Sequence, residues 1–112
     1  RSHSINKIGA IEPGDDNLNI LAQVFQFYLG NPAEPLPNGK KARVVLGDET
    51  GIARAFLWNH DSLVAGKTIV LFKGEACVVK EHIEIQLMER GKVDEARREV
   101  REVNKANDIS AK

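Results

Sequence analysis

The chain has 112 residues, of which 16 are Lys or Arg and 16 are Asp or Glu, so its formal net charge at pH 7 is zero. That length suits one domain with a modest core and is too short for a second. Zero net charge argues against a protein that holds nucleic acid through bulk positive charge, so any such binding requires locally placed cations.

The single cysteine, Cys77, cannot form an internal disulfide, and its place in an apolar run predicts a buried thiol. The sequence contains no segment suited to a membrane span and no signal-peptide pattern at its start. We therefore expect an intracellular protein, with nucleus, cytoplasm and organelles not distinguished. Because the chain opens at Arg1 rather than at a methionine, we expect residues 1–4 to be a tag remnant or a disordered start, unless the chain is a fragment or a processed form. Residues 5–112 are expected to form one domain.

In chain order, the first expected strand covers residues 18–29, which are rich in branched and aromatic side chains. Because this stretch is longer than an ordinary strand, we expect it to bend near its middle. Residues 31–39 include three prolines, which preclude a regular ladder and predict a loop.

Residues 43–58 form the most informative stretch, because side-chain character alternates with period two on both sides of a tight acidic turn. Asp48, Glu49 and Thr50 supply the turn chemistry, and Gly51 is expected to take the positive φ that closes the loop. The sequence therefore predicts a hairpin of two strands.

The second strand of this hairpin has an unusual outer face. If its small and aliphatic residues point inward, then Arg54, Phe56 and Trp58 all point outward. An aromatic pair beside a guanidinium is a poor surface for solubility and a good platform for stacking planar bases. The alternative is buried packing, in which a bulge moves either aromatic into the core or a helix covers it.

Residues 59–66 form a connector, and the apolar residues 68–72 predict another strand. Residues 73–74, a Lys-Gly pair, permit a kink or a bulge. Residues 75–79 and 82–87 then predict two more short strands.

Residues 93–107 leave two structures open. Their apolar positions fall at helical spacing among good helix formers, which favours a helix. A sheet of this kind, however, needs a last strand to close, and a terminal helix would leave an open edge. The apolar positions of residues 93–107 are Val93, Ala96, Val100 and Val103.

The chain as a whole contains many short strands with glycine-rich corners. This pattern predicts a small closed or nearly closed barrel.

Several short motifs then invite comparison with a known family. The most specific are the Pro-Gly of residues 11–14 and the Asp-x-Thr-Gly turn of residues 47–51, together with their spacing. In these features the chain resembles the eukaryotic single-domain OB-fold proteins that bind single-stranded nucleic acid. That family includes the OB-fold protein of the SOSS single-stranded-DNA sensor complex and related plant proteins with one OB domain, and the resemblance covers residues 5–110. The other matching positions are residues 17–20, Trp58, residues 63–66, residues 73–74 and residues 103–104.

The resemblance implies an all-β, five-stranded OB-fold Greek-key barrel, with residues 96–104 as its last strand despite their helical spacing. It also implies binding of single-stranded DNA or RNA across the barrel face, a role in DNA repair, and neither a catalytic site nor a cofactor. Trp58 matches one of the stacking positions of the family.

Three other stacking positions of the family lack aromatics in this chain. Glu75, Val79 and Gln86 stand there instead. Because stacking contributes about 1 to 3 kcal/mol per base, these differences weaken binding unless Phe56 and Phe72 compensate. A carboxylate at the first of the three positions also repels phosphate.

The residues that carry catalysis or bind metal in other proteins are poorly arranged here. His3, His60 and His82 lack the paired spacing of a zinc site, and we expect them to be surface or loop residues. Asp48 and Glu49 are adjacent on a tight turn, where their carboxylates splay apart and serve turn formation. We expect a protein that is not an enzyme and binds no metal.

The leading interpretation is a non-catalytic OB-fold module that binds single-stranded DNA or RNA through stacked bases and phosphate contacts. The alternative is a protein–protein interaction adaptor within a larger nucleic-acid-processing complex, in which the aromatics anchor a partner chain. The candidate contact residues are Trp58, Phe56, Arg54, Lys41, Arg43, Phe72, Lys73 and Lys80.

Overall fold

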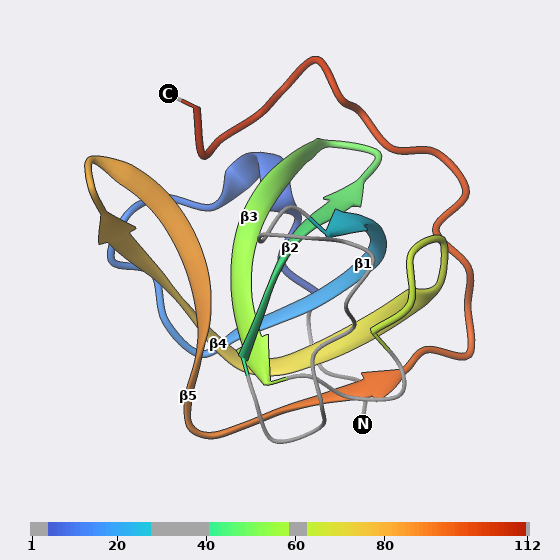
Figure 1. The fold of residues 1–112 in the computed structure, drawn as a ribbon, viewed down its shortest axis with the longest axis horizontal. Helices are drawn as coiled ribbons and strands as arrows, with labels where there is room; N and C mark the ends of the chain where they lie inside the picture. The colour runs from blue at the N-terminus through green and yellow to red at the C-terminus, as the bar shows by residue number, and fades with distance from the viewer. Residues whose placement is uncertain (1–4, 28–40, 59–62, 112) are drawn as a thin grey trace.

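The structure is a computed structural model, and it describes residues 5–27, 41–58 and 63–111. In these residues five strands form a closed barrel in the order β1-β2-β3-β5-β4 (Figure 1). This arrangement confirms the prediction of an all-β, five-stranded barrel. The elements are a short 3-10 helix η1 (Ile8–Ala10) and the strands β1 (Leu18–Phe27), β2 (Lys41–Asp48), β3 (Gly51–Trp58), β4 (Thr68–Val79) and β5 (His82–Glu95).

The barrel closes through strands that are not neighbours in sequence. β1 is antiparallel to both β2 and β4, and its register with β2 shifts between Val24 and Gln26. This bulge lies in the part of the strand where a bend is expected. The first half of β1 pairs with β4 and the second half with β2. β3 and β5 are parallel over a short stretch that begins with Arg54 opposite Glu84.

Alternation along β2 and β3 directs small and aliphatic side chains into the barrel. Ala53, Ala55 and Leu57 are fully buried, and so are Val44 and Leu46 on the facing strand. Burial of an aliphatic side chain of the larger kind stabilises the fold by about 1.5 to 3 kcal/mol. The predicted inward face of the hairpin is confirmed.

The hairpin turn is two residues long, because Asp48 pairs with Gly51 and only Glu49 and Thr50 lie between them. The backbone at Gly51 does not have a positive φ, so that prediction is wrong. Glycine is needed there for space, since a Cβ atom would lie 2.7 Å from the carbonyl oxygen of Asn107.

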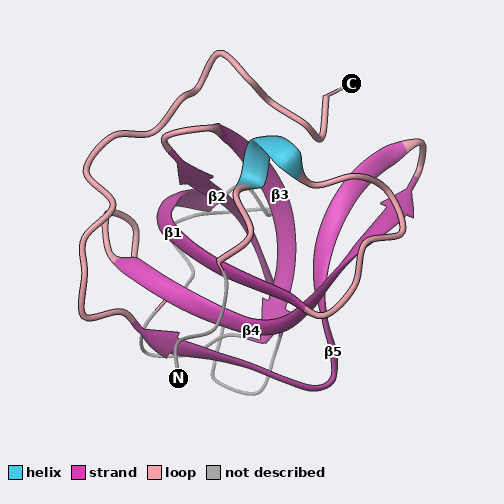
Figure 2. Ribbon diagram, turned by 180° about the vertical axis from the view of Figure 1, so that it is seen from behind, coloured by secondary structure: helices cyan, strands magenta, loops and turns pink. Residues whose placement is uncertain are grey.

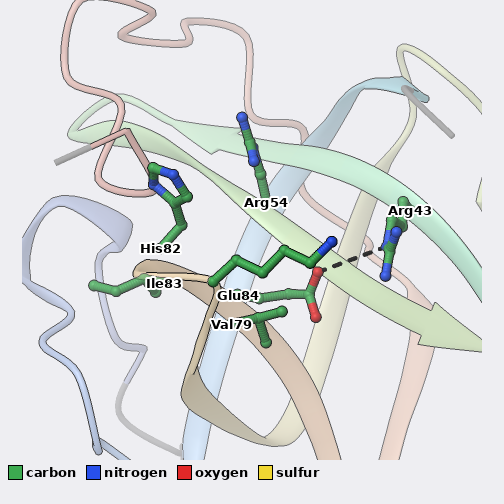
Figure 3. Close-up of a pocket in the computed structure, with 7 residues that line it drawn as sticks. Arg43, Arg54, Val79, His82, Ile83 and Glu84 are labelled. Carbon is green, nitrogen blue, oxygen red and sulfur yellow. Dashed lines mark ion pairs between the residues drawn. The ribbon is translucent and has the colours of Figure 1, made fainter.

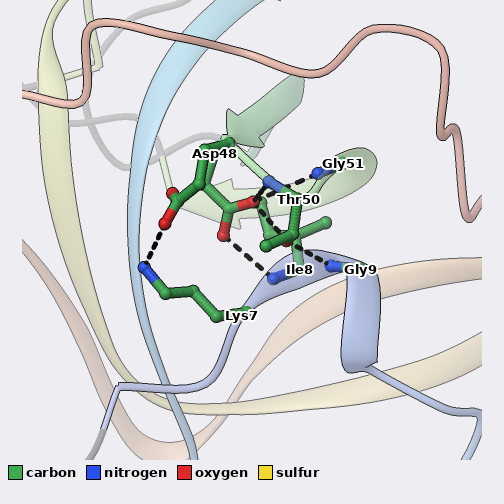
Figure 4. A network of polar contacts seen from close by, with 7 residues as sticks. Lys7, Ile8, Gly9, Asp48, Thr50 and Gly51 are labelled. Carbon is green, nitrogen blue, oxygen red and sulfur yellow. Dashed lines mark hydrogen bonds and ion pairs between the residues drawn. The ribbon is translucent and has the colours of Figure 1, made fainter.

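The carboxylate of Asp48 closes the turn instead (Figure 4). It is fully buried and accepts hydrogen bonds from the backbone N–H groups of Thr50 at 2.8 Å and Gly51 at 3.2 Å. Its second oxygen accepts from the N–H of Ile8 at 2.9 Å, which ties the turn to η1. The prediction that this acid serves the turn is confirmed.

β4 and β5 are longer than the sequence predicts. The two expected strands over residues 68–72 and 75–79 are one strand, in which a bulge absorbs Lys73 at a φ of 56°. β5 extends to Glu95 because its far half pairs with the first half of β4. The separate short strands are therefore a correction: the bulge lets the ladder continue instead of ending it.

Residues 96–111, which we call the C-terminal strap, correct both alternatives for the end of the chain. Among the described residues they form neither a helix nor the last strand implied over residues 96–104. The strap runs along the outside of the barrel from β5 to the C-terminus (Figures 1 and 2). It is held by separate hydrogen bonds, from Asn104 N–H to the Asp48 carbonyl and from Ile52 N–H to the Asn107 carbonyl, both 2.9 Å. No further strand is needed because β5 already closes the sheet.

Some predictions lie outside the described residues: the loop over residues 31–39, the end of the first strand at residues 28–29, residues 1–4, and part of the connector. His3 and His60 also lie there. Within the described part of the chain, the helix is far too short to cross a membrane.

Candidate nucleic-acid interface

The outer face of the β2–β3 hairpin carries the aromatic and cationic residues. Strand register places Trp58 opposite Lys41, and Phe56 opposite Arg43. Trp58 is 53% exposed, so the alternative in which it packs into the core is excluded. Phe56 is partly buried but points away from the inward-facing Ala55 and Leu57.

Arg43 is the central residue of this face. Its guanidinium carbon lies over the ring of Phe56, 4.8 Å from the ring centroid. Its Nε atom lies 3.8 Å from the Oε2 atom of Glu84, which is an ion pair but too long for a hydrogen bond. The same Nε atom is buried and has no hydrogen-bond partner in the described structure. The flat guanidinium therefore covers Phe56, so a ligand meets an arginine–aromatic stack rather than a bare ring.

β5 adds two polar side chains to the face. Glu84 is 6% exposed and lies beside Arg54 in the parallel register, and Gln86 lies beside Phe56. The Gln86 amide donates to the Oε1 atom of Glu84 at 2.9 Å. Glu75 on β4 pairs with Gln86, so a second carboxylate lies on the next strand. Carboxylates lie where a purely phosphate-binding surface would carry cations.

A groove of about 330 Å³ opens where β3 meets the β4–β5 hairpin (Figure 3). It brings together three of the predicted cations, Arg43 and Arg54 from the first hairpin and Lys80 from the turn between β4 and β5. The backbone at Lys80 and Glu81 has φ values of 51° and 70°, as in a type I′ hairpin turn. The remaining lining residues are Val79, His82, Ile83 and Glu84.

One wall of the groove is anchored by the C-terminal strap, a role that the sequence does not predict. The buried hydroxyl of Ser110 accepts from the Arg54 N–H at 2.8 Å and donates to the Ile83 carbonyl at 2.6 Å. The His82 Nδ1 atom lies 2.6 Å from the Ser110 carbonyl oxygen. His82 is thus a partly buried, hydrogen-bonded residue of β5 rather than a free surface histidine. No local sequence signal marks these contacts, because they join segments more than 25 residues apart.

The structure does not bring Phe72 to this face. Phe72 pairs with Lys92 of β5, whose ammonium lies 5.5 Å from its ring centroid. It lines a different groove, of about 610 Å³, together with Leu21 and Val70, and the two grooves share no lining residue. Lys73 is exposed at the β4 bulge, outside both grooves.

Cys77 is not a core residue, so that prediction is wrong. It lies on the outer face of β4, partly exposed, with its Sγ atom 3.5 Å from the Oε1 atom of Glu75. Partial burial raises the pKa of the thiol above its ordinary value, and the contact with Glu75 raises it further. The alternation of β4 explains the position: Ala76 points inward, so its neighbour must point outward.

No protein-family model and no curated protein matches the sequence. Solved structures do. A hypothetical protein from Arabidopsis thaliana superposes with a TM-score of 0.80 at 18% identity, covering 98% of this chain and 85% of that one. The OB domain of MM0293 from Methanosarcina mazei gives a TM-score of 0.62 at 20% identity, covering 84% of each chain. Schizosaccharomyces pombe Pot1pC bound to single-stranded DNA gives 0.65 at 13% identity, covering 85% of this chain and 88% of that one.

These similarities establish the fold. The closed five-stranded barrel is an OB-fold, as the resemblance of the sequence motifs predicts. Identities this low do not carry a binding activity from one protein to another. The narrower kinship with the SOSS family stays a prediction.

Proposed function

We propose that the protein is a non-catalytic OB-fold module that binds single-stranded DNA or RNA on the outer face of β2, β3 and β5. Bases stack on Trp58 and on the Arg43–Phe56 pair, and phosphates meet Arg54 and Lys80. The observation that carries this proposal is the exposed indole of Trp58, aligned on one face with a guanidinium–ring stack. Flat, sequence-tolerant platforms of this kind hold unpaired bases.

Similar structures support the proposal. Pot1pC, whose barrel superposes on this one, was solved bound to single-stranded DNA. The positions of Glu75, Val79 and Gln86 on this face limit the expected affinity, since none of them offers a ring. At about 1 to 3 kcal/mol per stacked base, we expect modest, salt-sensitive binding. From the resemblance of the sequence motifs to the SOSS family, we also propose a role in DNA repair inside the cell.

The test uses Trp58, the only tryptophan in the chain. Single-stranded oligonucleotides titrated at low salt should quench its fluorescence. With a labelled oligonucleotide and an anisotropy readout, Trp58→Ala should weaken binding by about 5- to 150-fold, whereas Trp58→Phe should retain most of the affinity. Ile5→Ala is the control, because Ile5 is an exposed apolar residue of the other groove. Absence of quenching, or equal affinity of Trp58→Ala and the unmodified protein, would refute the proposal.

A second function, a protein–protein adaptor in a larger nucleic-acid-processing complex, is favoured by the two carboxylates, Glu75 and Glu84, on the same face. Trp58 and Arg43 would then be anchors for a partner chain, since Trp and Arg are enriched at the centres of interfaces. Purification from the natural source separates the two proposals. A stoichiometric protein partner that shields Trp58 from a soluble quencher, with no bound nucleic acid, would favour the adaptor.

A further inference from the structure

Glu84 is an unusual residue for a groove that also holds three cations. It lines the groove with Arg43, Arg54 and Lys80, yet only 6% of its surface is exposed. A carboxylate at this depth repels a phosphate placed beside it, so the phosphates are expected at Arg54 and Lys80 rather than next to Glu84. A role limited to holding Arg43 would favour a short, bidentate pair, whereas the closest approach to the Arg43 Nε atom is 3.8 Å. The carboxylate therefore retains capacity to accept hydrogen bonds.

That capacity can be assigned to atoms. Oε1 of Glu84 accepts one hydrogen bond, from the Gln86 amide at 2.9 Å. Oε2 accepts none from the described residues, since its contact with Arg43 exceeds hydrogen-bond length. A carboxylate offers about four acceptor positions, so both oxygens can receive a further donor. Low exposure strengthens such a bond, because the local dielectric is lower than that of water.

The position of Glu84 relative to the stacking surface fixes what could donate to it. Arg43 lies over Phe56 on one side and approaches Glu84 on the other. Arg43 therefore borders both Phe56 and the groove, so a base stacked on Arg43 can extend one edge to Glu84. The groove volume of about 330 Å³ is at the small end of ligand pockets, which begin at roughly 300 Å³, and suits one nucleotide.

We infer that this groove holds one base of the bound strand and selects guanine, with Glu84 as the residue that determines the specificity. Guanine is the one common base whose pairing edge presents two adjacent donors, N1–H and the N2 amino group, which match the two oxygens of a carboxylate. Adenine and cytosine offer one amino group each. Thymine and uracil place a carbonyl on either side of their single N–H, and those oxygens are repelled by the carboxylate. The inference rests on the proposed function and names the base preference of that same site.

The experiment compares octamers of thymidine that carry one central guanine, hypoxanthine, adenine, cytosine or thymine, each with a fluorescein label for anisotropy. A bidentate contact is worth about 1 to 3 kcal/mol, so the guanine octamer should bind about tenfold more tightly than the thymine octamer. Hypoxanthine lacks only the N2 amino group. It should lose a large part of that preference in the unmodified protein, without any mutation.

Glu84→Gln should remove the preference, because the amide keeps one acceptor and adds a donor that tolerates the thymine carbonyls. Glu75→Gln is the matched control: it removes the same charge from the neighbouring strand but does not line the groove. It should tighten binding of all octamers alike and keep their order. Thermal unfolding of both variants checks that each is folded.

The outcomes separate the two proposals. If no octamer binds the unmodified protein, the proposed function fails. If all five bind with equal affinity, or hypoxanthine matches guanine, the specificity inference fails while nucleic-acid binding stands. A Glu84→Gln variant that is folded and still prefers guanine would also overturn the inference, and would leave Glu84 as a structural partner of Arg43.

Discussion

Among individual residues, Asp48 makes the densest set of contacts in the described structure. Besides the backbone groups of Ile8, Thr50 and Gly51, it accepts from the Thr50 hydroxyl at 2.5 Å. The Thr50 hydroxyl in turn accepts from the Gly9 N–H at 2.7 Å (Figure 4). One buried carboxylate thus connects the hairpin turn to the segment before β1, which gives the end of the barrel a fixed geometry.

Asp48→Asn should destabilise the protein by about 2 to 4 kcal/mol. The amide places two donors among N–H groups that need acceptors, and leaving buried N–H groups unpaired costs about 1 to 3 kcal/mol each, partly offset by the remaining oxygen. Urea denaturation followed by Trp58 fluorescence measures the change. A loss below about 0.5 kcal/mol would show that water replaces the carboxylate and that the network contributes little.

Glu49→Gln is the control for that experiment, because Glu49 is the exposed neighbour and its carboxylate pairs with the Lys7 ammonium at 2.7 Å. The hydrogen bond from Lys7 holds the pKa of Glu49 below its ordinary value. A lowered folded pKa means a contribution that is complete at neutral pH and disappears as the pH falls through the lowered value. Because the pair is exposed, we expect this change to stay below about 0.5 kcal/mol.

At the level of elements, two turns contain a residue with positive φ. Substitutions at these residues test the effect of backbone conformation on stability with little change in side-chain contacts. Glu81 has a φ of 70° in the β4–β5 turn, a region that non-glycine residues occupy at a cost. Gly66 has a φ of 92° before β4, and a Cβ atom there would meet nothing within 4 Å. Any effect of adding or removing a side chain at these positions therefore reports mainly on the backbone.

Glu81→Gly and Gly66→Ala should change stability in opposite directions. The first relieves a strained φ and should stabilise by up to about 1 kcal/mol, and the second should destabilise by about 1 kcal/mol. The midpoint of thermal unfolding measures both. If the two variants shift the midpoint in the same direction, the positive φ at one of the positions is not a source of strain.

The strands that sequence predicts well are those whose two faces differ. Period-two alternation located β2 and β3, and with them the outward Trp58, because one face is buried and the other is not. The lengths of β4 and β5 cannot be predicted from this alternation. A Lys-Gly pair can end a strand, but in this protein it forms a bulge within one.

The C-terminal strap shows how tertiary contacts override local preference. Its helical spacing is real, but Val103 packs against Gly47, where any larger residue would collide with it, and the Val100 N–H bonds to the Thr68 hydroxyl at 2.9 Å. Each contact joins residues more than 30 positions apart, so no local pattern could reveal them. The same limit applies to Glu84 and Arg43, whose proximity depends on the parallel pairing of β3 and β5.

The molecule as a whole has zero net charge, so nucleic-acid binding depends on where its charged side chains lie. The groove collects three cations, Arg43, Arg54 and Lys80, against one carboxylate, Glu84. The strap carries further cations, but they alternate with acids, as in the pair of Arg101 with the neighbouring Glu99 at 3.5 Å. We therefore expect phosphate contacts to be few and confined to the groove.

The salt dependence of the binding affinity measures the number of these phosphate contacts. For single strands, the logarithm of affinity falls with the logarithm of salt concentration at about −0.7 per neutralised phosphate, so phosphate contacts at Arg54 and Lys80 predict a slope near −1.4. Anisotropy titrations of a labelled thymidine octamer between low and physiological salt give the slope. Arg97→Gln with Arg98→Gln is the control, because both residues border the other groove, and it should leave the slope unchanged. A slope steeper than about −4 would mean that phosphates are bound outside the groove. A slope that this double variant reduces would mean that the strand follows the C-terminal strap, and the path across β2, β3 and β5 would then be wrong.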